Sequence, residues 1–246
     1  MKQIKVLCVI PARYASTRLP GKPLLDIAGK PMVEHTYRSA QMAQYVDEVV
    51  VATDDERIFS AVEKFGGKAM MTLPTHASGT DRLAEVAQKY NDVDVLINVQ
   101  GDEPLIDPAI IDRLVQVMLA EPMLEMATVK TLMDETEYNN PAAVKVVTDK
   151  EGYALYFSRS LIPYPRNEDN FAAYKHIGLY AYRKDFLLKF SSLPQGILEQ
   201  IEGLEQLRAL ENGSKIKVLA VDSVAIGVDT EEDLQEVRKI LEKTNG

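Results

Sequence analysis

Three basic side chains gather in one short segment of an otherwise acidic chain. The segment, residues 11–23, reads Pro-Ala-Arg-Tyr-Ala-Ser-Thr-Arg-Leu-Pro-Gly-Lys-Pro and contains Arg13, Arg18 and Lys22. Its small residues let the backbone approach an anion, whose charge exposed N–H groups can bind. Cations and exposed amides are what a triphosphate requires, so the segment is a candidate polyphosphate site. A solvated basic loop with turn prolines is the alternative that composition leaves open.

Two common phosphate-binding patterns do not describe this segment. In a Walker loop the lysine is followed by serine or threonine, whereas Lys22 is followed by Pro23. The glycine triplet of a dinucleotide fingerprint is also missing, which disfavours a dinucleotide-dependent dehydrogenase. The segment directly follows an apolar run at residues 4–10. We therefore expect it above the carboxyl end of a sheet, where open α/β sheets bind ligands.

A carboxylate follows another apolar run, at residues 93–99. Residues 98–104 read Asn-Val-Gln-Gly-Asp-Glu-Pro, and Gln100 and Asp102 share one face of an extended chain because strand side chains alternate. A carboxylate that faces a triphosphate suits Mg²⁺, which is usually held by one or two carboxylates together with phosphate oxygens and water. A helix cap or a turn residue is the alternative for Asp102.

A second candidate carboxylate, Asp229, precedes the last helical segment. Thr230 and Asp233 have the spacing of a capping box with Asp in place of Glu, so Asp229 falls just outside the helix. The alternative to a functional role is that Asp229 only assists that cap. The two aspartates can meet only through the fold, which the sequence alone does not prove.

A third candidate segment, Ser78-Gly79-Thr80-Asp81-Arg82, begins a helix. The amides at a helix N-terminus favour anions or carbonyl acceptors. The alternative is an ordinary capped helix with Arg82 on the surface.

The elements that position these residues alternate along the first half of the chain. Strands that alternate with helices of 10–15 residues predict an α/β fold, a mostly parallel sheet with helices on both faces. After Glu125 the expected strands follow one another with few helices between them, and residues 149–152 form a predicted hairpin turn. We expect one α/β domain over residues 1–246, with an inserted, more antiparallel lobe at about residues 126–212. Strands are predicted at residues 4–10, 46–52, 68–72, 93–99, 126–133, 143–148, 153–158, 175–182 and 215–221, and helices at 32–45, 56–65, 78–90, 108–120, 184–191, 198–211 and 230–243.

Composition excludes several classes of protein. The 246 residues carry a net charge of −9, which argues against a nucleic-acid partner because backbone binding needs a basic surface. The single cysteine, Cys8, excludes a disulfide framework and a cysteine-based zinc site. Apolar runs fall far short of the roughly 20 residues that span a bilayer, so no membrane partner is expected. The N-terminal run is followed by Pro-Ala-Arg and not by a cleavage site, which predicts a cytoplasmic protein.

The sequence resembles the bacterial 3-deoxy-manno-octulosonate (Kdo) cytidylyltransferases. The segments that carry this resemblance follow one another in the family's order along nearly the whole chain. The resemblance implies a nucleotide-diphospho-sugar transferase type of fold, a homodimer, and activation of the acid sugar Kdo by CTP with release of pyrophosphate, for lipopolysaccharide biosynthesis. The matching segments are residues 10–23, 53–57, 78–83, 98–104, 144–147, 156–160, 176–182, 204–208 and 227–234.

The resemblance also assigns roles around CTP. Arg13, Ser16 and Lys22 would hold the triphosphate, and the segment with Ser78, Gly79 and Arg82 would recognise cytosine. Gln100 would contact nucleotide or sugar. Asp102 and Asp229 would bind Mg²⁺ together, and the catalytic set would be Arg13, Lys22, Asp102 and Asp229.

The inserted lobe supplies the candidates for sugar binding, again through the resemblance. Arg159 would bind the sugar carboxylate, because its planar fork matches two oxygens. Glu205 has an alternative as a solvated helix residue, and His176 as a core or edge histidine of its strand. The candidates for the sugar hydroxyls are His176, Tyr180, Glu205 and Gln206.

Two other functions stay open from the sequence. The chain could activate another acid sugar, such as 8-amino-Kdo or a sialic-type nonulosonate. It could also be a non-catalytic nucleotide-binding module, although the presence of both Asp102 and Asp229 argues against that.

Overall fold

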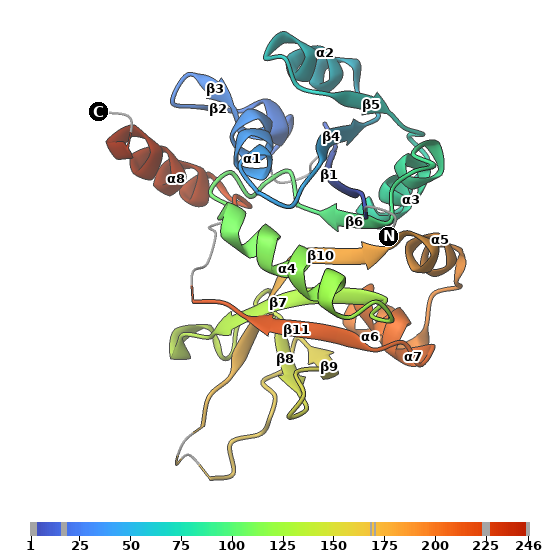
Figure 1. The fold of residues 1–246 in the computed structure, drawn as a ribbon. Coiled ribbons are helices and arrows are strands. Elements are labelled where there is room, and N and C mark those ends of the chain that lie inside the picture. The colour runs from blue at the N-terminus through green and yellow to red at the C-terminus, as the bar shows by residue number, and fades with distance from the viewer. Residues whose placement is uncertain (1–3, 16–18, 168, 170, 223–226, 245–246) are drawn as a thin grey trace.

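Nine strands of the described chain form one sheet. The computed structural model describes residues 4–15, 19–167, 169, 171–222 and 227–244. Along the main path the strands are ordered β11-β7-β10-β6-β1-β4-β5, and β8 and β9 branch from β10 (Figure 1). The strands are β1 (Val6–Ala12), β4 (Glu48–Thr53), β5 (Ala69–Met71), β6 (Val95–Asn98), β7 (Met126–Leu132), β8 (Lys145–Thr148), β9 (Ala154–Ser158), β10 (Tyr174–Arg183) and β11 (Ile216–Ala220).

Along its main path the sheet is mostly parallel, as predicted. β1 pairs in parallel with β4 and β6, β4 with β5, and β7 with β11. β10 runs antiparallel to both of its neighbours on the path, β6 and β7. The chain leaves β1 toward β4 on one side and later returns to β6 on the other. The carboxyl ends of β1 and β6 therefore flank a topological switch point, where open α/β sheets bind ligands.

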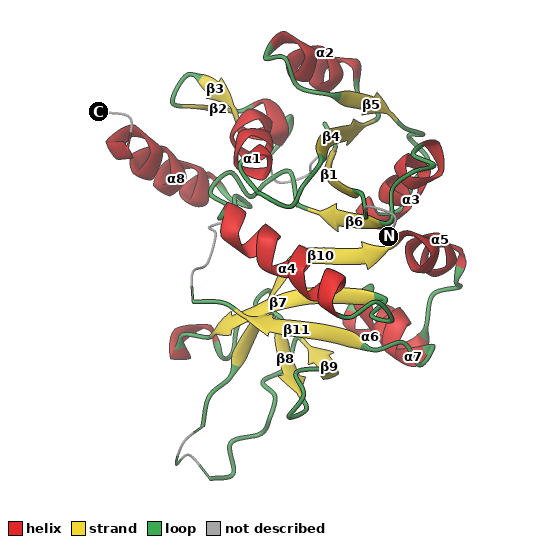
Figure 2. Cartoon of the chain, in the orientation of Figure 1, coloured by secondary structure: helices red, strands yellow, loops and turns green. Residues whose placement is uncertain are grey.

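Helices cover both faces of this sheet, which confirms the predicted fold class (Figure 2). On one face lie α1 (Met32–Gln41), α2 (Glu56–Lys64) and α4 (Pro108–Ala120). On the other lie α3 (Gly79–Lys89), α5 (Lys184–Ser192) and α7 (Gln206–Glu211). Both faces of the central strands are thereby buried, which explains why those strands read as continuous apolar runs.

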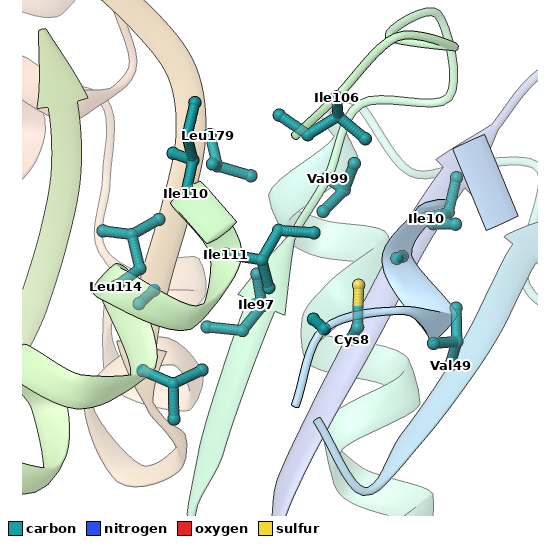
Figure 3. Close-up of a cluster of buried hydrophobic side chains, with 14 of the residues drawn as sticks. Cys8, Ile10, Val49, Ile97, Val99, Ile106, Ile110, Ile111, Leu114 and Leu179 are labelled. Carbon is teal, nitrogen blue, oxygen red and sulfur yellow. The ribbon is translucent and has the colours of Figure 1, made fainter. Parts of the chain in front are cut away.

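The side chains of β1 divide between these two layers. Cys8 and Ile10 pack in the layer of α4, together with Ile97 of β6 and Ile111 of the helix (Figure 3). The alternate residues Leu7 and Val9 pack in the opposite layer. A strand fixed on both faces holds the loop that follows it at a defined place.

Residues 126–212 lie partly inside and partly outside the central sheet. They supply β7 and β10 to the main path, while β8 and β9 form a hairpin beside β10. The predicted turn at residues 149–152 joins that hairpin. Asp149 caps the turn by accepting hydrogen bonds from the amides of Glu151 and Tyr153. A short 3₁₀ helix, η2 (Glu135–Glu137), follows β7.

A smaller hydrophobic cluster joins the segment after β1 to the last helix. The hairpin of β2 (Asp26–Ile27) and β3 (Lys30–Pro31) follows the 3₁₀ helix η1 (Lys22–Leu24). Neither the hairpin nor this short helix was predicted from the sequence. Ile27 packs with Leu234 and Val237 of the last helix, α8 (Glu231–Thr244). This contact brings the start of α8 next to the loop after β1.

One predicted helix is wrong in its extent. Residues 198–211 were expected to form a single helix, but the structure has α6 (Ile197–Glu202) and α7 (Gln206–Glu211). Gly203 ends α6 in the left-handed conformation with φ of 61°, which glycine adopts without a steric penalty. The apolar pattern continues through the break, so periodicity alone did not reveal it.

Among the described helices, none is both long and apolar enough to cross a membrane.

Candidate active site

Three segments meet at the carboxyl ends of β1 and β6. The loop after β1 brings Arg13, the residues after β6 bring Gln100 and Asp102, and Asp229 precedes α8. They surround a cavity of about 320 Å³. Its lining is Pro11, Ala12, Arg13, Ala15, Lys22, Pro23, Gln100, Gly101, Asp102 and Asp229.

Lys22 lies at the centre of this site. Its Nζ donates to Asp102 Oδ2 at 2.6 Å and to Asp229 Oδ1 at 3.1 Å. The same ammonium group donates to the backbone oxygen of Val228 at 2.7 Å, and the Val228 amide donates to the backbone oxygen of Asp102 at 2.9 Å. The structure therefore brings the two aspartates, distant in sequence, to one side chain.

Two glycines permit this close approach. Gly21 precedes η1 in the left-handed conformation, with φ of 69°, and its amide donates to the backbone oxygen of Tyr14 at 3.0 Å. A Cβ at Gly101 would lie 2.9 Å from the backbone oxygen of Pro11, closer than real Cβ contacts. Glycine at 101 thus lets the loop after β6 rest against the loop after β1.

The donor set fits a hard divalent cation that also binds phosphate. Asp102 and Asp229 offer two carboxylates close together, and Mg²⁺ usually takes one or two from the protein. Among the described residues there is no group of three or more His, Cys, Asp or Glu that could hold a metal ion. The remaining ligands would have to come from substrate or water.

Arg13 and Gln100 extend the site in two directions. Arg13 Nη2 donates to the backbone oxygen of His76 at 3.0 Å, toward the segment that leads into α3. Gln100 Nε2 donates to the backbone oxygen of Gly178 at 3.2 Å, which ties the loop after β6 to β10. Ser16, the third predicted triphosphate ligand, lies outside the described residues.

The start of α3, which was predicted, has a capping box. Ser78 accepts from the amide of Asp81 and Asp81 accepts from the amide of Ser78, and Gly79 lies against Pro11. The alternative that Arg82 is a surface residue is wrong, because its side chain is fully buried. The guanidinium donates to the Thr72 hydroxyl, and its Nη2 lies 3.1 Å from Asp54 Oδ2.

The predicted sugar-binding residues other than Gln100 do not line the cavity around Lys22. His176 and Tyr180 lie on β10 with ring centroids 5.4 Å apart, and His176 packs edge-on against Phe157 at 4.9 Å. His176 Nε2 lies 3.0 Å from the Thr128 hydroxyl. Burial lowers the pKa of His176 to about 3 and raises the pKa of Tyr180.

The Arg159 guanidinium donates hydrogen bonds to backbone oxygens. Its Nε, Nη1 and Nη2 donate to the backbone oxygens of Glu202, Pro141 and Gly203 at 2.6, 2.9 and 3.3 Å. It therefore joins the end of α6 to the segment before β8. Gln206 begins α7 as a buried residue, directly after Glu205.

Glu103 is a residue of this region that the sequence analysis did not single out. It follows Asp102, is 8% exposed, and its Oε2 is buried without a hydrogen-bond partner among the described residues. Burial, with a further contribution from the charge of Asp102, raises the pKa of Glu103 to about 8. The turn that buries it depends on tertiary packing, and its only sequence signal was its place next to Asp102.

The family model described as cytidylyltransferase matches residues 7–216. The chain therefore belongs to the cytidylyltransferase class. The chain is 52% identical over 244 residues to the 3-deoxy-manno-octulosonate cytidylyltransferase of Syntrophotalea carbinolica, covering 95% of this chain and 97% of the relative. It is 50% identical to that of Fusobacterium nucleatum, covering 98% and 99%. The chain belongs to the 3-deoxy-manno-octulosonate cytidylyltransferase family.

Solved structures agree with this placement. A CMP:2-keto-3-deoxy-manno-octonic acid synthetase complexed with CTP is similar with a TM-score of 0.95 at 50% identity, covering 98% of this chain and 99% of that one. The 4-diphosphocytidyl-2C-methyl-D-erythritol synthase of Anaerococcus prevotii has a TM-score of 0.65 at 13% identity, which shows a shared fold alone.

Proposed function

We propose that the protein transfers the cytidylyl group of CTP to Kdo and releases pyrophosphate, for lipopolysaccharide biosynthesis. The observation that carries the proposal is the meeting of Lys22 with Asp102 and Asp229 at the switch point of the sheet. The chain is also about 50% identical, over nearly its full length, to the 3-deoxy-manno-octulosonate cytidylyltransferases of Syntrophotalea carbinolica and Fusobacterium nucleatum.

The reaction is an in-line displacement at phosphorus. The oxygen of the C2 hydroxyl of Kdo bonds to the α-phosphorus of CTP, the bond to the bridging oxygen breaks, and pyrophosphate leaves with that electron pair. The hydroxyl proton passes to solvent water. Such transfers depend on positioning and charge stabilisation more than on covalent chemistry by the protein.

The basic residues would bind the triphosphate. Lys22 and Arg13 would neutralise the charge of the leaving pyrophosphate, and Ser16 would add a further contact. Lys22 has to exchange the two carboxylates for phosphate oxygens, which its flexible four-carbon stem permits. Ser78, Gly79 and Arg82 would form the cytosine side of the site. The ion pair with Asp54 orients the Arg82 guanidinium.

Asp102 and Asp229 would hold Mg²⁺. When bound, the metal supplies charge neutralisation at the α-phosphate and lowers the pKa of the sugar hydroxyl. The two carboxylates are held for this by the backbone link between Val228 and Asp102 and by the capping box at the start of α8.

The sugar would lie between Gln100 and the face of β10. Gln100 is anchored to Gly178, between His176 and Tyr180. Glu205 and Gln206 would add polar contacts from the start of α7. Arg159 would bind the sugar carboxylate through the edge of a guanidinium already oriented by three backbone oxygens.

A substrate panel tests the proposal. The protein is incubated with CTP, Mg²⁺ and, in turn, Kdo, 8-amino-Kdo and a sialic-type nonulosonate, while pyrophosphate release is followed. We expect the highest kcat/KM with Kdo. A higher kcat/KM with another acid sugar would identify that sugar as the substrate. No pyrophosphate release with any of the three sugars would support a non-catalytic nucleotide-binding module.

We also propose that the protein is a homodimer. Large apolar side chains are exposed on α6 and on β9, among them Ile197 (73%), Ile201 (75%) and Leu155 (62%). The two elements are neighbours, because the Ser158 hydroxyl at the end of β9 donates to Glu202 at the end of α6. Apolar surface that is exposed on neighbouring elements marks interaction sites. Light scattering should give twice the chain mass of 27.5 kDa, and Leu155→Glu with Ile201→Glu should shift it toward the monomer. A wild-type monomer at all concentrations would refute this.

A further inference from the structure

Thr80 links the nucleotide side of the site to the inserted lobe. It lies in the first turn of α3, is 3% exposed, and its hydroxyl donates to Oε2 of Glu205. Glu205 precedes α7, 125 positions further along the chain. This hydrogen bond joins the segment that would recognise cytosine to a residue that would bind sugar.

The other carboxylate oxygen of Glu205 is available as an acceptor. Oε1 is buried and has no hydrogen-bond partner among the described residues, although Arg208 Nη2 lies 3.5 Å away. The Arg208 guanidinium is directed instead at Glu199, to which its Nε donates at 2.7 Å. Buried polar atoms are nearly always hydrogen-bonded, so a buried carboxylate oxygen that accepts no hydrogen bond is a candidate acceptor for a ligand.

The surroundings of Glu205 point to the sugar side. Tyr180 packs in the same hydrophobic cluster as Leu204 and Leu207, which lie on either side of Glu205 in the chain. Burial raises the pKa of Tyr180, and the charge of Glu205 raises it further. Burial also raises the pKa of Glu205, an effect that the hydroxyls of Thr80 and Ser78 partly offset. The carboxylate is thus placed between the start of α3 and the aromatic face of β10.

We infer that Thr80 is a positioning residue that fixes the Glu205 carboxylate, so that Oε1 accepts a hydroxyl of the bound acid sugar. The inference rests on the proposed function and adds to it. A free glutamate side chain has several rotamers, and ordering it on binding costs affinity. The Thr80 hydroxyl orders Oε2 beforehand, so sugar affinity depends on a residue of the nucleotide segment.

The test separates sugar affinity from nucleotide affinity. Thr80→Val keeps the shape of the side chain and removes the hydroxyl, whereas Thr80→Ser keeps the hydroxyl. KM for Kdo and kcat are measured at saturating CTP, and the Kd of CTP is measured by calorimetry without sugar. Both variants are also combined with Glu205→Gln.

Thr80→Val should raise KM for Kdo about tenfold, the effect of losing one hydrogen bond to a charged group. The kcat value and the Kd of CTP should stay within roughly twofold, the pattern of lost ground-state binding. Thr80→Ser should behave like wild type. Thr80→Val should add little in the Glu205→Gln background, because coupled residues are not additive.

Three outcomes would overturn the inference. KM for Kdo is unchanged in Thr80→Val; the Kd of CTP rises as much as KM for Kdo; or the effects of Thr80→Val and Glu205→Gln simply add. The second would show that Thr80 only supports the nucleotide segment. Wild-type protein that releases no pyrophosphate from CTP with Kdo would instead refute the proposed function, and this inference with it.

Discussion

Asp102 has two separate contacts that a single substitution can distinguish. Its side chain accepts from Lys22 at 2.6 Å, while its backbone oxygen accepts from the Val228 amide at 2.9 Å. Asp102→Asn removes the charge and keeps the backbone link. We expect kcat to fall about a hundredfold or more, because several kcal/mol of charge stabilisation are lost, while CTP binding partly survives. Pyrophosphate release and CTP calorimetry measure the two effects.

A matched control lies on the same segment. Asp107 caps α4 and does not line the site cavity, so Asp107→Asn should change kcat by less than about twofold and cost only the modest stability of a cap. Normal turnover in Asp102→Asn would contradict the proposed metal-binding role of this carboxylate.

His176 makes stability depend on pH. Its pKa falls from the ordinary 6.5 to about 3 because it is packed among aromatic rings, so the folded protein favours the neutral ring. The resulting stability is fully present above pH 6.5 and is lost as pH falls toward 3. In that window the free energy of unfolding of His176→Gln should change less steeply with pH, by up to about 1.4 kcal/mol per unit. Denaturant melts at several pH values measure it, and identical slopes in both proteins would contradict it.

Some site residues could be named from the sequence and others could not. Lys22, Asp102 and Asp229 stood in segments with recognisable chemistry, but their meeting depends on how β1, β6 and α8 are arranged. Thr80 and Glu103 carried no comparable signal. Their importance comes from burial and from partners far along the chain, and neither property is local.

At the level of elements, α2 supports the loop after β1. The Arg57 guanidinium lies over the Tyr14 ring, 3.2 Å from its centroid, and is oriented by two hydrogen bonds to Asp55. Tyr14 in turn accepts from the amide of Gly21, next to Lys22. Arg57→Met should therefore loosen the loop and raise KM for CTP about threefold to tenfold, with a smaller change in kcat.

Arg38→Met is the control for that prediction. Arg38 is an arginine of α1 that also lies over an aromatic ring, that of Phe65, and it donates hydrogen bonds to Gln41 and to the backbone oxygen of Phe65. Its KM for CTP should equal that of wild type. Equal KM values for Arg57→Met and Arg38→Met would show that α2 does not hold the loop.

Element boundaries could be predicted where a local signal ends them. Asp107 and Pro108 begin α4 at the predicted residue, and Asp55 caps α2, which begins at residue 56 as predicted. The break at Gly203 was missed because an isolated glycine inside an apolar pattern is compatible with a continuous helix. The place of β10 between β6 and β7 was not predictable either, because strand order depends on long-range pairing.

At the level of the whole molecule, the topology explains why the site draws on the entire chain. The parallel strands β6 and β1 place their following loops side by side, and α8 returns from the far end of the sequence to add Asp229. Ligand binding to such a site stabilises the whole fold, because unfolding separates all three segments.

This coupling gives a test that does not depend on catalysis. At about one hundred times its Kd, CTP should stabilise the protein by about 2.7 kcal/mol, a rise in Tm of roughly 5 to 10 °C. With Mg²⁺ present the rise should exceed that measured with a chelator. In Asp102→Asn combined with Asp229→Asn the difference between the two conditions should disappear, whereas Asp107→Asn should keep it. A Mg²⁺-dependent rise that persists unchanged in the double variant would place the cation elsewhere.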